Sequence, residues 1–106
     1  MTKVLIEPGI CKLNTTVHAE MNEDEEVVVT VHSGCEPVKK MMEALGDTFD
    51  PMEVCLVKPG EGPFYEYAKQ HFPVHVACPA INGILKAMEA EAGLALKYDA
   101  SIRFIE

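Results

Sequence analysis

The chain has 106 residues, of which 48% are hydrophobic and 25% are charged, a composition typical of one soluble globular domain with a single core. Acidic residues outnumber basic ones by 17 to 9 and give a net charge of −8. Because nucleic acids and anionic membranes bind clustered lysine and arginine, and the basic residues here are scattered, we expect neither as a partner. No apolar run could span a bilayer and no signal peptide is evident, so we expect a single cytoplasmic domain over residues 1–106.

The first third of the chain predicts three strands. Residues 3–7 (KVLIE) form a short strand before a Pro-Gly turn, and residues 15–21 (TTVHAEM) alternate between apolar and polar side chains. A polar turn over residues 22–25 leads to a third strand over residues 26–33 (EVVVTVHS). The alternation and the turn predict a hairpin in which the strand over residues 15–21 is half buried.

The rest of the chain is mainly helical. Apolar residues at helical spacing, prolines in first turns and glycines past the ends predict four helices: one from Pro37 to Gly46, a short one after the N-cap Asp50, one over residues 64–72 and the longest from Pro79 to Gly93. Residues 73–77 predict a short extended piece, and residues 101–106 (SIRFIE) predict a last strand. This order of elements predicts an α+β fold, with a small antiparallel or mixed sheet covered on one face by helices.

Four cysteines are the candidates for chemistry, namely Cys11, Cys35, Cys55 and Cys78. Cys35 and Cys78 each come at the start of a predicted helix, where unpaired N–H groups and the helix dipole favour a thiolate. A thiolate is a nucleophile or a metal ligand. Cys11 lies in the loop where the chain enters the hairpin, so these three thiols could converge at one end of the sheet. In a reducing compartment free thiols are favoured over the disulfides that an even number of cysteines permits.

No local motif such as C-x-x-C or H-E-x-x-H is present, so the fold must assemble any metal site. We predict a site built from the three converging thiols, which would suit zinc or an iron–sulfur cluster. The candidates for the fourth ligand are Cys55, His32 and His75. Any of the cysteines could instead be a small buried hydrophobe, and this alternative is favoured for Cys55 on its short amphipathic helix. No catalytic triad, carboxylate pair or phosphate-binding loop is recognisable, so the sequence favours a binding protein over an enzyme.

Three cysteine-bearing segments, GICKLNTTVHAEM, VHSGCEPVKKMMEAL and FPVHVACPAINGILKAMEAEAG, resemble in order those of the iron–sulfur cluster scaffold proteins, the NifU-like N-terminal domain family. The resemblance covers about residues 9–93, and the intervals of 24 and 43 positions between the cysteines are close to those of the family. Leu13 and Ala77 stand where the family has an acidic residue and a histidine. The chain is also similar to small uncharacterised cysteine-containing proteins of anaerobic bacteria and archaea.

The resemblance implies a SufE/NifU-like α+β fold and a three-thiol site for zinc or a nascent [2Fe–2S] cluster, formed by Cys11, Cys35 and Cys78. It also implies sulfur-donor or cluster-acceptor proteins as partners. Two other classes of function remain open. One is a thiol-based sulfur carrier or transferase with Cys35 or Cys78 as its nucleophile. The other is a small interaction domain whose cysteines are only structural.

Overall fold

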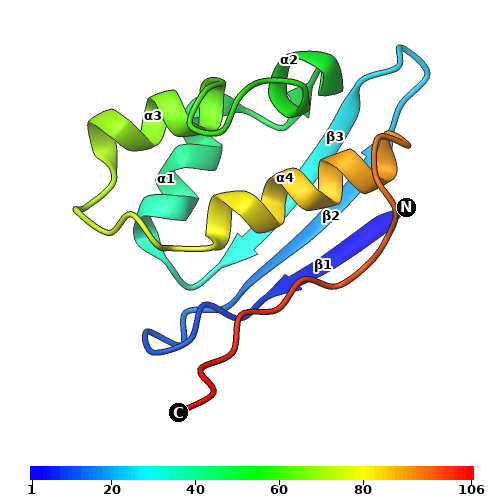
Figure 1. Cartoon of the computed structure of the whole chain (residues 1–106). Coiled ribbons are helices and arrows are strands. Elements are labelled where there is room, and N and C mark those ends of the chain that lie inside the picture. Colours follow the sequence, from blue (N-terminus) through cyan, green and yellow to red (C-terminus); the bar gives the residue numbers. More distant parts are fainter.

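The computed structural model describes residues 1–106 and contains one four-stranded antiparallel sheet with the strand order β1–β2–β3–β4 (Figure 1). The strands are β1 (Thr2–Ile6), β2 (Thr15–Met21), β3 (Val27–Ser33) and β4 (Thr48–Phe49). The helices are α1 (Glu36–Leu45), α2 (Pro51–Cys55), α3 (Pro63–His71) and α4 (Ala80–Glu91). The α+β fold predicted from the sequence, with an antiparallel sheet packed against helices, is confirmed.

The alternating pattern of β2 and β3 separates the two faces of the sheet. Residues Thr15, Val17 and Ala19 are buried on the face that carries the helices, whereas the intervening positions of β2 are at least partly exposed. β2 and β3 pair along their whole length, from Thr15 opposite Ser33 to the far end of the hairpin. Because side chains alternate along a strand, the opposite face of the sheet stays open to solvent.

The helices begin and end where the local chemistry places them. Pro37 lies in the first turn of α1, and Gly46 ends that helix with a φ of +86° while its N–H donates to the Met42 carbonyl. The Asp50 side chain caps α2 by accepting a hydrogen bond from the Met52 N–H at 2.9 Å. These capping signals explain why the sequence locates both helices closely.

Two helices lie directly on the sheet and two form an outer layer. α4 lies across β1 and β2, and α1 packs on β3, while α3 packs on α1 and α2 packs on α4 (Figure 1). α4 approaches β1 so closely that a Cβ atom at Gly83 would overlap the Ile6 side chain. A glycine at this position therefore sets the distance between the longest helix and the edge of the sheet.

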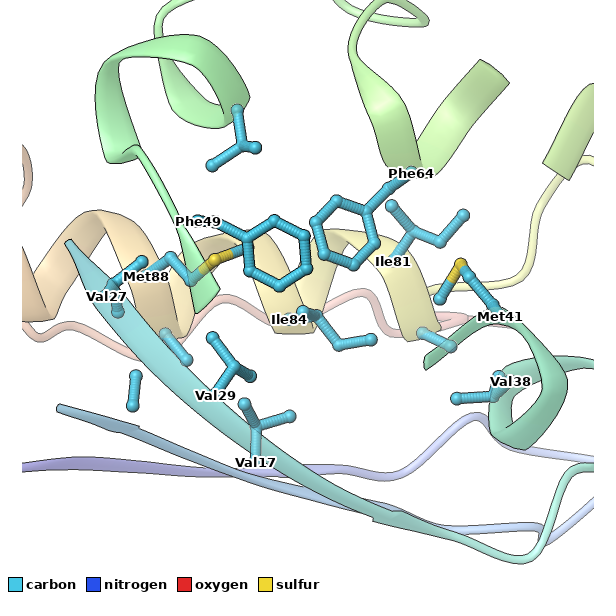
Figure 2. Packing of buried hydrophobic residues seen from close by; sticks show 14 of the residues in the cluster. Val17, Val27, Val29, Val38, Met41, Phe49, Phe64, Ile81, Ile84 and Met88 are labelled. Atoms are coloured by element: carbon cyan, nitrogen blue, oxygen red, sulfur yellow. The ribbon is translucent and has the colours of Figure 1, made fainter. Parts of the chain in front are cut away.

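A single hydrophobic cluster fills the space between the layers (Figure 2). Phe64 of α3 and Phe49 of β4 meet at its centre with their ring centroids 5.1 Å apart. The sheet, α1 and α4 surround the two rings with aliphatic side chains and methionines, among them Val17, Val27, Val29, Val38, Met41, Ile81, Ile84 and Met88. Helical spacing places Met41, Met42 and Met88 on inward stripes. Met41 and Met88 are fully buried in this core, and Met42 packs against it partly buried.

Three details differ from the sequence-based expectation. The two-residue strand β4 was not predicted, because it depends on pairing with the start of β3 rather than on any pattern of its own. Residues 73–77 were predicted as an extended piece but form an irregular loop with a turn. The last strand predicted over residues 101–106 is wrong, because this stretch forms no ladder and all its residues are exposed. None of the helices has the length and apolar character needed to cross a membrane.

Candidate functional site

Three of the four cysteines lie at one end of the sheet, which we call the cysteine end. Ile6, Thr15 and Ser33 occupy neighbouring positions in the last row of the β1–β2–β3 ladder. The loop that carries Cys11 joins the first two of these residues, and Cys35 follows the third by two positions. α4 begins at this same end, because its first turns pack against Ile6, and Cys78 comes two residues before α4 (Figure 1). The topology therefore gathers three cysteine-bearing loops.

Cys35 is the most firmly positioned of the three. It is the N-cap residue of α1, and its side chain is half buried against the core. Its N–H donates to the Ser33 Oγ at 3.1 Å, and that hydroxyl shares a 2.7 Å hydrogen bond with the buried Thr15 hydroxyl. The last residue of β3 thus fixes the N-cap residue of α1, a role of Ser33 that the sequence pattern did not reveal.

Cys78 sits in the loop between α3 and α4, directly before the N-cap Pro79. Its N–H donates to the His75 carbonyl at 3.4 Å, which closes a turn, and its side chain is half buried against the core. The residues just before it are exposed, and Val74 and Val76 are fully so. The thiol is therefore anchored by the start of α4, while the preceding loop has few contacts.

Cys11 is exposed in the loop between β1 and β2. Residues 9–14 are all exposed, and the one backbone hydrogen bond inside this stretch runs from the Lys12 N–H to the Gly9 carbonyl at 3.0 Å. Lys12 has a φ of +57°, in the left-handed region that most residues avoid. A loop with so few buried contacts is expected to open and close at little cost.

Cys55 occupies a different part of the molecule. It is the last residue of α2, and the helix α2 packs on α4. Burial, and to a smaller extent the charge of Glu89, raises the pKa of the Cys55 thiol to about 11. Cys55 is therefore a neutral thiol near pH 7. Glu89 lies near the end of α4, about 14 Å along the helix axis from its start at 1.5 Å per residue. The structure therefore does not bring Cys55 together with Cys78, and the site we consider below does not include it.

The histidines proposed as a fourth ligand are both exposed. His32 alternates with Ser33 along β3 and points to the open face of the sheet, whereas His75 lies in the turn that contains Cys78. No three histidine, cysteine or acidic side chains are grouped closely enough to hold a metal ion in this arrangement. Two shallow hollows of about 510 Å³ and 720 Å³ lie between β3 and α1 and beside α2, and no cysteine lines either.

The opposite end of the sheet is held by one carboxylate. Glu91, at the end of α4, accepts from the Thr2 Oγ1 at 2.8 Å and from the Met21 N–H at 3.1 Å, and the N-terminal amine lies 3.6 Å away. Burial would raise the pKa of Glu91, but these two hydrogen bonds and the charges of the N-terminus and Lys97 outweigh it, so the pKa is lowered. A single side chain thus joins α4 to β1 and β2.

These observations define a class of protein: an α+β domain with helices on one face of an antiparallel sheet and three cysteine-bearing loops at one end of it. Residues 2–104 match a protein family described as a family of unknown function (DUF6951), and the chain belongs to that family. No curated protein and no solved structure matches the chain. The family match does not itself indicate an iron–sulfur scaffold, so the likeness to scaffold proteins stays a hypothesis.

Exposed apolar residues lie close in sequence to two of the three cysteines, a feature that sequence reasoning did not single out. Ile10 and Leu13 flank Cys11, and Val74 and Val76 precede Cys78, all of them exposed. Neighbouring apolar residues in turn-rich segments are a signal that could have drawn attention to this surface, since loops are usually polar. The loops that carry Cys11 and Cys78 therefore expose apolar side chains as well as charged ones such as Lys12.

Proposed function

We propose that the protein binds a thiophilic metal, either zinc or a [2Fe–2S] cluster, through the thiols of Cys11, Cys35 and Cys78. The observation that carries this proposal is the convergence of three cysteine-bearing loops from separate parts of the chain at one end of the sheet. Soft thiolate ligands suit both zinc and iron–sulfur clusters. A core that needs small hydrophobes would not explain Cys11, because that side chain is exposed.

The two half-buried thiols provide a fixed base and the exposed one completes the site. Cys35 is held by the start of α1 and Cys78 by the start of α4, whereas the loop around Cys11 has a single internal backbone hydrogen bond. Since the three side chains do not form a ligand group as they stand, binding requires this loop to close over the other two. His75 is the fourth-ligand candidate that shares a turn with Cys78.

Metal binding of this kind should have two further measurable effects. The thiols must lose their protons to coordinate, so binding releases protons and strengthens as the pH rises. Ordering of the loop around Cys11 is part of the binding free energy, so the bound metal should protect that loop from hydrogen exchange and proteolysis. Both effects are measurable without any knowledge of a physiological partner.

The first test is elemental analysis and an absorption spectrum of the protein purified without oxygen. About one zinc per chain, or iron with sulfide and visible charge-transfer bands, is the expected result. Cys11→Ser, Cys35→Ser and Cys78→Ser should each lose most of the metal, while the matched control Cys55→Ser should keep it. Unchanged metal content in all three variants, or a protein that stays free of metal after reconstitution, would overturn the proposal.

A sulfur carrier with Cys35 or Cys78 as its nucleophile is the second candidate, favoured by the position of both residues at helix starts and by the absence of a three-ligand group. In this function a thiolate attacks the terminal sulfur of a donor persulfide, forms a new S–S bond on this chain and releases the donor thiolate. Mass spectrometry after incubation with a small persulfide should then find one added sulfur on a single cysteine of the metal-free protein. Slow labelling of Cys35 and Cys78, with no persulfide formed, would leave these two cysteines as structural residues.

A further inference from the structure

The chain ends in a stretch that has the side-chain pattern of a strand but is unpaired in this structure. Apolar and polar side chains alternate from Leu96 to Phe104, a pattern typical of a strand with one buried face. The four large apolar side chains, Leu96, Tyr98, Ile102 and Phe104, are between 81% and 96% exposed. No backbone hydrogen bond joins residues 95–106 to the sheet. The family match extends to residue 104, so this stretch lies within the region that the family shares.

The free edge of the sheet that lies nearest to this stretch is β1. It pairs only with β2, so one side of its five residues has no strand beside it. In Figure 1 the stretch leaves the end of α4 next to the N-terminus and runs beside β1 toward the cysteine end. The stretch therefore follows the same direction as β1, as a parallel strand would.

The charge of Lys97 locates the start of the stretch. Against the effect of burial, the pKa of Glu91 is lowered by its two hydrogen bonds and then by the charges of the N-terminus and Lys97. Glu91 is the residue that binds Thr2, the first residue of β1. Lys97 therefore lies near the beginning of β1. The six residues between Glu91 and Tyr98 span up to roughly 20 Å, enough to descend from the helix layer to the sheet.

Only some registers would turn the apolar face of the stretch toward the helices. Thr2, Val4 and Ile6 are the residues of β1 on the face of the sheet that carries the helices. With Tyr98 level with Thr2, Ala100 is level with Val4 and Ile102 with Ile6. A shift of one residue would turn all the apolar side chains to the open face.

Charges single out this register among those that keep the apolar face inward. Asp99 is then level with Lys3, and Arg103 is level with Glu7, on the open side of the sheet. Neighbouring strands are about 4.8 Å apart, so each pair brings opposite charges within reach of one another. A shift of two residues in either direction would lose both pairs. The two complementary pairs, each spaced by four residues on both segments, match the stretch to the edge of its own chain.

We propose that residues 98–103 close onto β1 of the same chain as a fifth, parallel strand, with Tyr98 level with Thr2 and Arg103 level with Glu7. The structure holds this strap in its open position, beside the edge that it closes. Closure gives the unpaired backbone of β1 a partner and removes an edge on which other chains could pair. Phe104 then comes level with Pro8, where the loop that carries Cys11 begins.

The flank of α4 supplies the cover for the apolar face of the closed strap. Gly83 is the point at which α4 meets Ile6 of β1. Pro79 and Ala90 lie about one and two helical turns from Gly83 on the same side of the helix, and both are only partly buried. Val4 of β1 is also partly buried. The strap therefore meets an apolar surface that the rest of the domain leaves incompletely covered.

Hydrogen exchange and NMR on the intact, metal-free protein test this inference. We expect the amides of residues 98–103 to exchange about tenfold more slowly than those of an unstructured peptide of the same sequence. Nuclear Overhauser contacts should join Ala100 to Val4 within one chain.

A charge exchange tests the register. Asp99→Lys places two positive charges side by side and should return the exchange rates of the strap toward those of the peptide. Adding Lys3→Glu to that variant restores an opposite pair and should restore the slow exchange. The control Glu43→Lys makes the same change of charge at an exposed position of α1 and should leave the strap protected.

Several results would overturn the inference. Exchange at the peptide rate in the wild type would show that the strap does not close. Protection that survives Asp99→Lys, or that Lys3→Glu fails to restore, would show that the strap is held in another way. Contacts of Ala100 with a residue other than Val4 would place it elsewhere, and contacts between labelled and unlabelled chains in a mixture would place it on another molecule. None of these readouts depends on a bound metal, so the outcome is independent of the proposed function.

Discussion

The two ends of α4 differ in how they are held. At its C-terminal end, Glu91 is tied to β1 and β2 by two hydrogen bonds and the N-terminal amine. At its N-terminal end, the loops that carry Cys11 and Cys78 are exposed and each contains few backbone hydrogen bonds. The difference indicates that one end of α4 is fixed by specific interactions, whereas the loops at the other end are expected to open locally at less cost.

Between its two ends, α4 packs closely against β1. Disrupting this packing should have the largest effect on the free energy of unfolding. Gly83→Val would push side-chain atoms into the Ile6 side chain, which is buried. We expect a loss of about 3 kcal/mol in the free energy of unfolding, the upper part of the range for overpacked cores. Urea denaturation measures it.

Lys86→Val is the matched control for this substitution, because Lys86 is exposed on the same helix. The control changes helix propensity by about 0.5 kcal/mol and adds no clash. Equal stability of the two variants would contradict the close approach at Gly83. Adding Ile6→Val to the glycine variant should restore part of the loss, since it removes one of the atoms that the new side chain meets.

Glu91→Gln tests the fixed end and should have the next largest effect. An amide can accept one of the two hydrogen bonds but must turn its NH₂ group toward the other donor, so we expect a loss of about 2 kcal/mol at pH 7. The Met21 N–H and the Thr2 hydroxyl are the donors concerned. A destabilisation no larger than that of an exposed Glu43→Gln control would show that this end is not specially held.

The pH dependence of this effect has a definite sign. The pKa of Glu91 is lower in the folded protein, so its contribution to stability is fully present above the unfolded pKa of about 4.3 and is lost as the pH falls through the folded value. The difference between the wild type and Glu91→Gln should therefore be constant near neutral pH and shrink below about pH 4. A difference that grows on acidification would contradict this account.

Ser33→Ala tests the cysteine end and should have a smaller effect on stability. The substitution removes the acceptor of the Cys35 N–H and the partner of the buried Thr15 hydroxyl. We expect a loss of about 1 kcal/mol in stability and faster hydrogen exchange at the start of α1. Ser101→Ala, in an exposed stretch without hydrogen-bond partners in the sheet, should change neither quantity. No change in exchange at Cys35 would show that Ser33 does not position it.

The sequence predicted the elements whose signals are local. The alternation of residues 15–21 and the caps at Asp50 and Gly46 lie in a few neighbouring residues, so β2, α1 and α2 were located closely. β4 was not predicted, because a two-residue strand has no periodic pattern and depends on its pairing with β3. The strand predicted over residues 101–106 is wrong: these residues form no ladder and are all exposed, because a strand forms only when it pairs with another edge.

The candidate site also has parts that local sequence signals predicted and parts that they did not. Placement of Cys35 and Cys78 at helix starts followed from Pro37, Pro79 and the periodicity that comes after them, and their shared location with Cys11 follows from the sheet topology. Whether three side chains meet is a question of loop conformation, which spacing along the chain does not determine. The anchoring role of Glu91 was also missed, because several acidic residues lie near the end of α4 and only the packed structure distinguishes them.

Cys11→Ser should give the smallest change in the stability of the metal-free protein and a clear contrast with the metal-loaded protein. The side chain is exposed and makes no hydrogen bond, so the free energy of unfolding of the metal-free protein should change by less than about 0.5 kcal/mol. The metal-loaded protein should behave differently, because loss of a ligand removes the stabilisation that bound metal adds to the folded state. Thermal unfolding with and without a chelator measures both. A chelator effect as large in Cys11→Ser as in the wild type would show that the flexible loop takes no part in binding, and the adaptable end of the molecule would then need another function.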